Sequence, residues 1–572
     1  MEHIKRYFPI LHWLPAYKKA YLPGDISAGL TVGVMLIPQG MAYALIAGLP
    51  PVYGLYAALV PQLVYAVMGT SRQLGVGPVA MDSLLVASGI SVMATEGSEA
   101  YIAFAIMLAF FVGAFQFFLG VARLGFITNL LSQPVISGFT SGAAVIIATN
   151  QLKHLAGLEV GRSNRIYELV DMLGKAFGQV HLATVGLGIG GIIAIMLIKR
   201  LNKRIPGALL VVILGILLVS LMGLDEAGVA IVQEIPKGLP AFEVPGLSWE
   251  VFMRMLPLAG TIAVVAFIEA FSISKGIEAK VKDHQVRPNQ ELLALGTANM
   301  LGSLFMSYPS TGSFSRSAIN YASGGRTPLA FIISALLVGL ILIFLTPLFY
   351  YLPLAVLASI IMVSVINLIE VKYPLRLWRT NKVEFALLIA TFLVTLNVSL
   401  VTGIITGVVL SILMLLYKAA YPHVAILGRV RNSKEFRNIS RFNDLEVWDN
   451  LLIIRVDAPY AFINIQTIRE RILLEAETRK GKITHVILDA SSVTHIDASA
   501  VQGINELMQS LKEMNVQLVF SSAIGPVRDV FHKNWALDGA EGQLFLNTDL
   551  AVRSLTGEHV ELHSEHAAQA NV

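Results

Sequence analysis

Residues 69–85, GTSRQLGVGPVAMDSLL, and residues 306–319, MSYPSTGSFSRSAI, each place glycine, proline and small side chains directly before a short apolar helix. The unpaired N–H groups at a helix start, with a macrodipole equivalent to about half a positive charge, form an anion site without any cofactor. Two such starts facing each other would double the effect. A plainer interpretation is that Gly77, Pro78 and Gly312 only break helices, because glycine and proline are common in membrane spans.

The composition around these segments is that of a membrane protein. Of 572 residues, 55% are apolar and only 14% are charged, and the mean hydropathy is +0.68. Soluble domains carry about a quarter of charged residues. The net charge of +4 is too small to indicate a nucleic-acid partner, and the basic residues stand in short clusters between apolar blocks.

About fourteen apolar stretches, some near 20 residues and several shorter, run from Gly24 to Tyr421, which predicts an α-helical polytopic membrane protein. The third and tenth stretches are short and hold corresponding places in two sets of seven, the pattern of a seven-plus-seven inverted repeat with broken helices at the midplane. The predicted spans are 24–46, 52–69, 79–94, 101–122, 127–150, 181–199, 206–223, 254–275, 291–307, 313–323, 328–350, 353–369, 383–398 and 400–420.

Lys and Arg are about three times as frequent in one set of alternating loops as in the other. By the positive-inside rule this places the N-terminus in the cytoplasm, and an even number of spans returns the C-terminus to the same side. The basic and aromatic first 25 residues lack the apolar core of a signal peptide, so we expect them to be retained. We expect the chain in the cell (inner) membrane.

After Tyr421 the sequence becomes that of a soluble domain, in which strand and helix patterns alternate. Such alternation predicts a small α/β layer domain. The predicted organisation is a cytoplasmic N-terminal segment at 1–23, a transmembrane transport domain at 24–425, the α/β domain at 436–557 and a disordered tail at 558–572.

Arg316 is the basic residue inside the tenth span, where an arginine costs about 2.5 to 3.5 kcal/mol to insert unless it has a role. With Ser313 and Ser315 beside it, Arg316 would supply a positive field and hydroxyl donors to an oxyanion. The alternative is a structural ion pair with Glu269 or Asp82.

Glu269 is the carboxylate in the middle of the apolar eighth span, and Asp82 lies about one turn into the third. A buried carboxylate can load a proton together with the anion, so both residues are candidates for the coupling ion, proton or sodium. The alternative for Glu269 is a structural role, in a helix-packing hydrogen bond or an ion pair with Arg316. The alternative for Asp82 is a carboxylate that faces water and has no function.

Gln39 and Tyr43 in the first span are four residues apart, on one helical face just after Pro38. They would line the pocket, although a lone Gln or Tyr in a membrane helix more often makes an interhelical hydrogen bond.

Several function classes are disfavoured. The chain has no cysteine, which excludes disulfides, thiolate metal sites and cysteine nucleophiles. It contains no phosphate-binding loop, HExxH or GxSxG motif, which argues against an ATP-driven pump, a metalloprotease and a serine hydrolase. We expect no cofactor and no enzymatic activity.

The segment LIPQGMAYALIAGLPPVYGLYAALVPQLVYAVMGTSRQLGVGPVA, residues 36–80, closely resembles the signature of the sulfate permease (SulP) family of anion transporters. The likeness extends over PVISGFTSG at 134–142 and ALGTANMLGSLFMSYPSTGSFSRSAIN at 294–320. The C-terminal domain resembles a STAS domain (sulfate transporter and anti-sigma antagonist). Together these segments cover essentially the whole chain.

The resemblance implies a core and a gate domain, an elevator-type movement of the core, and a homodimer. It carries the family's anion pocket over to Gln39 and Tyr43, to Val79 and Ala80 at the start of the third span, to Glu269, and to Ser315 and Arg316.

Two further expectations concern coupling and regulation. Sodium-coupled relatives have an Asp in the eighth span followed four residues later by Thr, whereas here Glu269 is followed by Ile273, which favours a proton. In the STAS domain, Asp497 and Ser499 occupy the places of an Asp and a phosphorylated Ser of anti-sigma antagonists. Ser499 is therefore a candidate phosphosite for a cytoplasmic regulator, and an unmodified capping role is the alternative.

The sequence thus predicts proton-coupled uptake of sulfate or a similar small inorganic anion through the lipid bilayer. Bicarbonate or dicarboxylate transport stays open because these anions have similar bulk, and so does an anion exchanger, a channel or a voltage-responsive motor.

Overall fold

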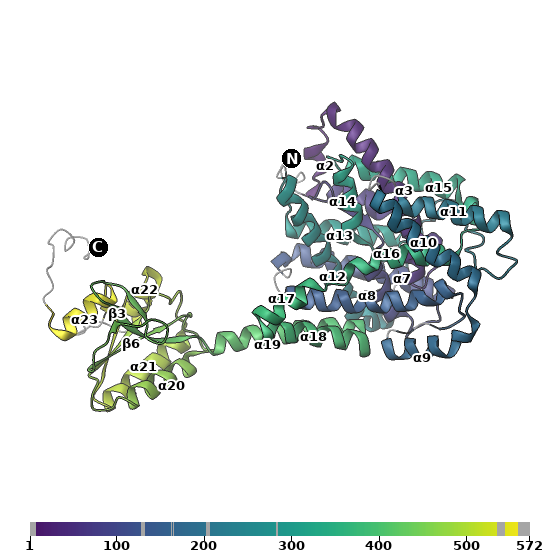
Figure 1. Ribbon diagram of the computed structural model, residues 1–572. Helices are drawn as coiled ribbons and strands as arrows, with labels where there is room; N and C mark the ends of the chain where they lie inside the picture. Colours follow the sequence, from purple (N-terminus) through teal and green to yellow (C-terminus); the bar gives the residue numbers. More distant parts are fainter. Residues whose placement is uncertain are drawn as a thin grey trace. The chain divides into compact units, whose positions relative to one another are not determined.

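The computed structural model describes residues 7–126, 132–161, 163, 165–201, 206–246, 248–281, 284–534 and 544–558 (Figure 1). The chain divides into two compact units, a helical unit up to Ser411 and a second unit from Ile412. The predicted first residues of the fifth span, 127–131, and the predicted tail from residue 559 lie outside the described residues.

Every predicted span contains a helix. Seven described helical segments are long and apolar enough to cross a membrane and four apolar helices are shorter, so the count of fourteen spans stays a prediction. The helices are α3 (Leu22–Ile46), α4 (Pro51–Tyr56), α5 (Val60–Met68), α6 (Ala80–Ile90), α7 (Glu99–Val121), α8 (Gln133–Ala156), α10 (Leu182–Leu201), α11 (Gly207–Met222), α12 (Trp249–Val281), α13 (Pro288–Ser303), α14 (Phe314–Ala322), α15 (Leu329–Phe344), α16 (Leu354–Val365), α18 (Lys382–Asn397) and α19 (Leu400–Ala420).

The sequence patterns did not predict several short elements. These are α2 (Ile10–Trp13), α9 (Ile166–Ala176), α17 (Lys372–Thr380) and two strands, β1 (Gly75–Gly77) and β2 (Thr311–Ser313).

Each helix–helix contact described below recurs between the equivalent helices of the other half of the unit. The first-half helix α3 packs on α15 of the second half, and its counterpart α12 packs on α7. Likewise α8 packs on α18 while α16 packs on α10, and α14 packs on α3 while α6 packs on α12. The strands β1 and β2 run antiparallel, so the two halves cross in opposite directions, as in an inverted repeat.

Glycines bring helices into close contact within two groups. We call α3–α7 with α12–α15 the core group, and α8–α11 with α16–α19 the gate group. In the core group a Cβ on Gly29 would lie 2.8 Å from Ile333, and one on Gly113 would lie 2.6 Å from the Met300 backbone nitrogen. In the gate group a Cβ on Gly142 would lie 2.9 Å from Thr395, and one on Gly191 would lie 2.8 Å from Ser359. Among the described glycines of this unit, each approach closer than 3 Å joins segments of the same group.

The second unit contains an α/β layer domain, in which strands and helices alternate from β6 onward as predicted. Its main sheet has the order β4 (Phe436–Asn438), β3 (Val424–Val430), β6 (Leu451–Val456), β7 (His485–Asp489), β8 (Gln517–Ser521) and β9 (Leu544–Phe545), and β5 (Leu445–Glu446) pairs with β3. The strands β6 to β9 are parallel, and β3 is antiparallel to β6. The predicted start at residue 436 is too late, because β3 is part of the sheet.

Strand alternation divides the core of this domain into two layers. Leu452, Ile454 and Val456 pack against the helices α20 (Ile465–Glu477), α21 (Ala498–Glu513) and α22 (Gly525–Asn534). The alternate residues Leu451 and Ile453 pack on the other face, against α23 (Thr548–Thr556). Successive strand residues point to opposite faces, so both layers follow from the sequence pattern.

Candidate anion-binding site

Two strand-and-helix units cross at the centre of the helical unit. Gly75 pairs with Ser313 and Gly77 with Thr311 in the β1–β2 ladder. The helix α6 begins at Ala80 and α14 at Phe314. The two segments that predicted an anion site, far apart in the sequence, therefore lie side by side.

The crossing is fixed by side chains as well as by the ladder. The Ser317 hydroxyl accepts from the Gly75 N–H at 2.9 Å and donates to the Ser313 carbonyl at 2.6 Å. Thr311 Oγ1 donates to the Ala266 carbonyl of α12 at 2.8 Å. These bonds hold the crossed strands to one another and to the helix that carries Glu269.

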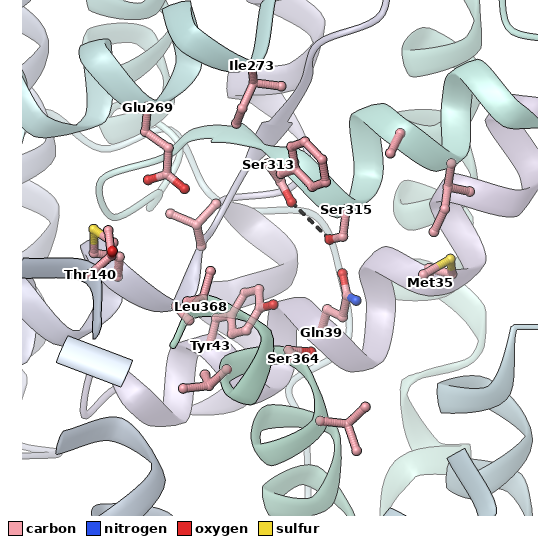
Figure 2. A pocket seen from close by; sticks show the side chains of 18 of the residues that line it. Met35, Gln39, Tyr43, Thr140, Glu269, Ile273, Ser313, Ser315, Ser364 and Leu368 are labelled. Atoms are coloured by element: carbon pink, nitrogen blue, oxygen red, sulfur yellow. Dashed lines mark hydrogen bonds between the residues drawn. The ribbon is translucent and has the colours of Figure 1, made fainter. Parts of the chain in front are cut away.

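A cavity of about 1530 Å³ lies beside the crossing, between the core and gate groups. Figure 2 shows part of its wall, with Gln39 extending from α3 toward Ser315 and Tyr43 one turn further along α3. On the gate side the wall includes Thr140 of α8 and Ser364 of α16. A space between two helix groups is a common position for a small-molecule site.

Seven of the predicted site residues line this cavity: Gln39, Tyr43, Val79, Ala80, Glu269, Ser313 and Ser315. The Gln39 carbonyl oxygen has no hydrogen-bond partner, and the hydroxyls of Ser313 and Ser315 lie 3.2 Å apart. These groups can bind a solute without first breaking strong internal bonds.

Arg316 is placed differently from its neighbour Ser315. It is fully buried, and it is not among the cavity-lining residues. Its Nη1 donates to the Pro78 carbonyl at 2.8 Å, just before α6 starts, while Nε and Nη2 have no partner. Glycine at 75 makes room for it, because a Cβ there would lie 3.0 Å from that of Arg316. Arg316 is thus behind the cavity wall, where its charge adds to the field of the helix starts.

Asp82 also lies behind the wall, fully buried on α6, and neither of its carboxylate oxygens has a hydrogen-bond partner. Glu269 faces the cavity, and its Oε2 is unpartnered. In the described chain no ion pair within 4 Å joins Arg316 to either carboxylate. The alternative of a direct structural ion pair therefore has no support in this geometry.

The gate side of the wall was not assigned from the sequence. Phe139 and Thr140 belong to the quoted segment PVISGFTSG, whose small polar residues are the one available signal. Ser364 and Leu368 also line the cavity, but they stand in apolar sequence without a distinctive pattern. Among the described residues no group of three or more His, Asp or Glu side chains is arranged to hold a metal ion.

In the second unit, Asp497 caps the start of α21. Its Oδ1 accepts from the Ala500 N–H at 2.8 Å and its Oδ2 from the Phe462 N–H at 2.8 Å. Ser499 is exposed in the first turn of that helix. The cap belongs to Asp497, which leaves the Ser499 hydroxyl accessible at a helix N-terminus.

Sequence comparison matches both units to known families. A profile described as the sulfate permease family matches residues 22–391, and one for the STAS domain matches residues 443–548. "Sulfate transporter 4.1, chloroplastic" of Arabidopsis thaliana is 37% identical over 548 residues, covering 93% of this chain and 79% of that protein. "High affinity sulfate transporter 2" of Stylosanthes hamata is 36% identical, covering 91% of this chain and 81% of that protein.

Solved structures share the fold. The murine Solute Carrier 26 family member A9 anion transporter in its inward-facing state matches with a TM-score of 0.90 at 25% identity, over 97% of this chain and 95% of that one. The transmembrane domain of a cyanobacterium bicarbonate transporter, BicA, matches with a TM-score of 0.60 at 23% identity, over 68% of this chain and 98% of that one. These matches confirm the resemblance predicted from the sequence motifs.

Proposed function

Because this chain belongs to the sulfate permease family, we propose that it takes up sulfate, or an oxyanion of similar size, together with protons. The crossing of β1 and β2 carries this proposal, because it sets the starts of α6 and α14 beside one cavity with a buried arginine behind them. Helix starts and a nearby cation stabilise a negative charge in a low-dielectric site.

Counting the charges around the cavity supports proton coupling. Arg316 contributes one positive charge, and Glu269 and Asp82 contribute two negative charges when both are ionised. Lys199 and Glu370, which also line the cavity, contribute one charge of each sign and leave this balance unchanged. A divalent anion entering such a site is repelled by the excess negative charge, and protonating the carboxylates removes the repulsion. By linkage, anion binding then favours proton binding to the same degree. The apolar Ile273 in the wall, where sodium-coupled relatives have a Thr, favours a proton over sodium.

The two helix groups support an elevator-type movement. Close glycine contacts join helices inside the core group and inside the gate group, so each group is suited to move as a rigid body. The core group carries Gln39, Ser315 and Glu269 and would take the anion with it. Lys199 and Ser27 are cavity-lining residues near helix ends that the charge asymmetry places in the cytoplasm, which favours an inward-open cavity.

Three further features belong to this proposal. The chain works in the cell membrane with both termini in the cytoplasm, and it forms a homodimer. Phosphorylation of the exposed Ser499, or binding of a cytoplasmic protein there, regulates transport, because a helix N-terminus stabilises a phosphate group.

Sulfate uptake into sodium-free proteoliposomes tests the proposal. We expect an acidic exterior to stimulate uptake by the unmodified protein. Glu269→Gln, which mimics the protonated side chain, should keep sulfate exchange between equal concentrations but lose the stimulation. Glu250→Gln is the control, because Glu250 lies on the same helix in an exposed pair with Arg254.

Competition by bicarbonate, fumarate, chloride and nitrate in the same vesicles tests the substrate. Sulfate uptake that requires sodium would refute the proton-coupled assignment. Transport of bicarbonate or fumarate but not of sulfate would refute the substrate assignment in favour of the alternative carriers.

A further inference from the structure

Two buried carboxylates outside the cavity hold the loops next to the crossing. The first is Asp25, in the first turn of α3 and fully buried. Its Oδ1 accepts from the backbone N–H groups of Arg326 at 2.7 Å and Thr327 at 3.1 Å. Its Oδ2 accepts from the Thr327 hydroxyl at 2.7 Å and from the Tyr17 hydroxyl at 3.2 Å.

The second is Glu291, in the first turn of α13 and also fully buried. Its Oε1 accepts from the Thr70 N–H at 2.7 Å, from the Thr70 hydroxyl, and from the Ser71 N–H at 3.3 Å. Its Oε2 accepts from the Tyr65 hydroxyl at 2.5 Å. The two carboxylates thus bind the same set of donors: a tyrosine hydroxyl, a threonine hydroxyl, the N–H of that threonine and one neighbouring N–H.

Each carboxylate holds a loop that belongs to the opposite half of the inverted repeat. Glu291, from the second half, holds residues 70–71, which lead into β1 and α6. Asp25, from the first half, holds residues 326–327, which follow α14. A contact beside each carboxylate reinforces the attachment of its loop. Next to Glu291, Gln290 Nε2 donates to the Met68 carbonyl at 2.9 Å, and next to Asp25, Gly24 packs directly on Gly324.

These carboxylates differ from the pair assigned to proton coupling. Neither Asp25 nor Glu291 lines the cavity, and every oxygen of both accepts at least one hydrogen bond. Asp82, in contrast, has two unpartnered oxygens and Glu269 has one. A carboxylate held by several donors is a rigid anchor, because charge-assisted hydrogen bonds are strong and directional.

We infer that Asp25 and Glu291 are positioning residues for the anion site: they anchor the two crossed strand-and-helix units at their loop ends, so that the starts of α6 and α14 keep the spacing that the anion requires. The need for anchors follows from size, since β1 and β2 have three residues each and α6 and α14 have 11 and 9. Helices this short are marginal by themselves. The inference rests on the proposed anion site.

The test uses threonine-to-valine variants, which remove one hydroxyl at nearly constant shape. Thr70→Val removes a donor to Glu291, and Thr327→Val removes a donor to Asp25. Thr297→Val is the matched control, because Thr297 lies on α13 and its hydroxyl donates only to the Leu293 carbonyl of its own helix. The two variants are comparable, since each hydroxyl also accepts from one backbone N–H: Thr70 from Arg287 at 3.2 Å and Thr327 from Leu329 at 3.3 Å.

We expect Thr70→Val and Thr327→Val each to raise the KM for sulfate about fivefold while kcat changes less, because a loosened loop weakens anion binding first. Hydrogen–deuterium exchange of the backbone amides at 74–77 and 311–313, measured on the full chain without substrate, should become faster in both variants. Thr297→Val should leave both quantities unchanged. The KM and the exchange rates of Glu291→Gln should lie closer to those of the unmodified protein than the values of Glu291→Ala. The Gln side chain keeps an oxygen that accepts from residues 70–71, and its amide N–H can donate to the Tyr65 hydroxyl.

An unchanged KM and unchanged exchange in Thr70→Val and Thr327→Val, with only a lower yield of folded protein, would overturn the inference and leave the carboxylates as general stabilisers. The exchange measurement also separates this inference from the proposed function. If the unmodified protein takes up no sulfate, the proposed function fails, while faster exchange in the two variants still supports the anchoring role.

Discussion

At the scale of single residues, the hydrogen-bond partners of buried charges distinguish the site from its scaffold. Asp25 and Glu291 have all their oxygens bound, whereas Asp82 and Arg316 keep buried polar atoms without partners. An unpartnered buried charge is costly, so its persistence indicates a ligand or a proton that completes it.

Arg316 provides the clearest test at this scale. We expect Arg316→Ala to lower sulfate uptake at least about 100-fold, because the two remaining carboxylates would face the anion without a compensating charge. Arg254→Ala is the control, since Arg254 lies in an exposed pair with Glu250 and should keep normal uptake. Uptake by both variants is compared per amount of folded protein in the vesicles. Near-normal uptake in Arg316→Ala would contradict the role given to its charge.

Seven of the nine residues that the sequence predicted for substrate and coupling-ion binding line the cavity, but the sequence did not predict how Arg316 is placed. Successive residues on a helix point about 100° apart, so Ser315 and Arg316 cannot both face the cavity squarely. Which of them does so depends on the pairing register of β2 with β1, and that register is a tertiary property.

At the scale of elements, β1 and β2 are the part of the site that the sequence patterns missed. Three-residue strands are too short to show alternation, and their partner residues are remote in the chain. In the STAS domain the longer strands were predicted because each is a short apolar run, such as LLIIRV, and these runs alternate with helical segments. The strand β3 was missed because VAILGRV directly follows the apolar last span.

Gly312 tests the crossing at this scale. A Cβ on Gly312 would lie 2.6 Å from Leu74 and 3.1 Å from Ala270, which would push β2 away from α12. We expect Gly312→Ala to destabilise the protein by about 1–3 kcal/mol through overpacking and to lower uptake at least about tenfold.

The control is Gly276→Ala in α12, where a Cβ would meet nothing within 4 Å. This substitution should keep full uptake and stabilise the helix by up to about 1 kcal/mol. Thermal unfolding and uptake are measured on both variants. Equal behaviour of the two would show that the tight fit at Gly312 has no consequence for transport.

At the scale of the whole helical unit, the cavity lies between two groups that are each tightly packed inside. Cysteine chemistry can test whether these groups move past one another, because the chain has no native cysteine. Thr31 on α3 of the core group and Ala208 on α11 of the gate group both line the cavity, and their helices are in contact.

Joining Thr31→Cys and Ala208→Cys with a cleavable bifunctional reagent should abolish sulfate uptake, because the core group can no longer slide against the gate group. Cleaving the reagent should restore uptake, and each single variant treated alike controls for modification of the cavity. Full uptake by the cross-linked protein would argue against a rigid-body movement between these groups.

The sequence by itself determined the membrane class, the family, the α/β character of the C-terminal domain and seven of the residues that line the cavity. These properties depend on composition, local periodicity and helix-breaking residues, which act over a few turns of chain. The tertiary structure alone decided the pairing of β1 with β2, the burial of Arg316 behind the wall, the gate side of the cavity and the anchoring of two loops by Asp25 and Glu291. All of these join residues that are distant in the chain, and their geometry depends on how the two halves of the repeat pack against each other.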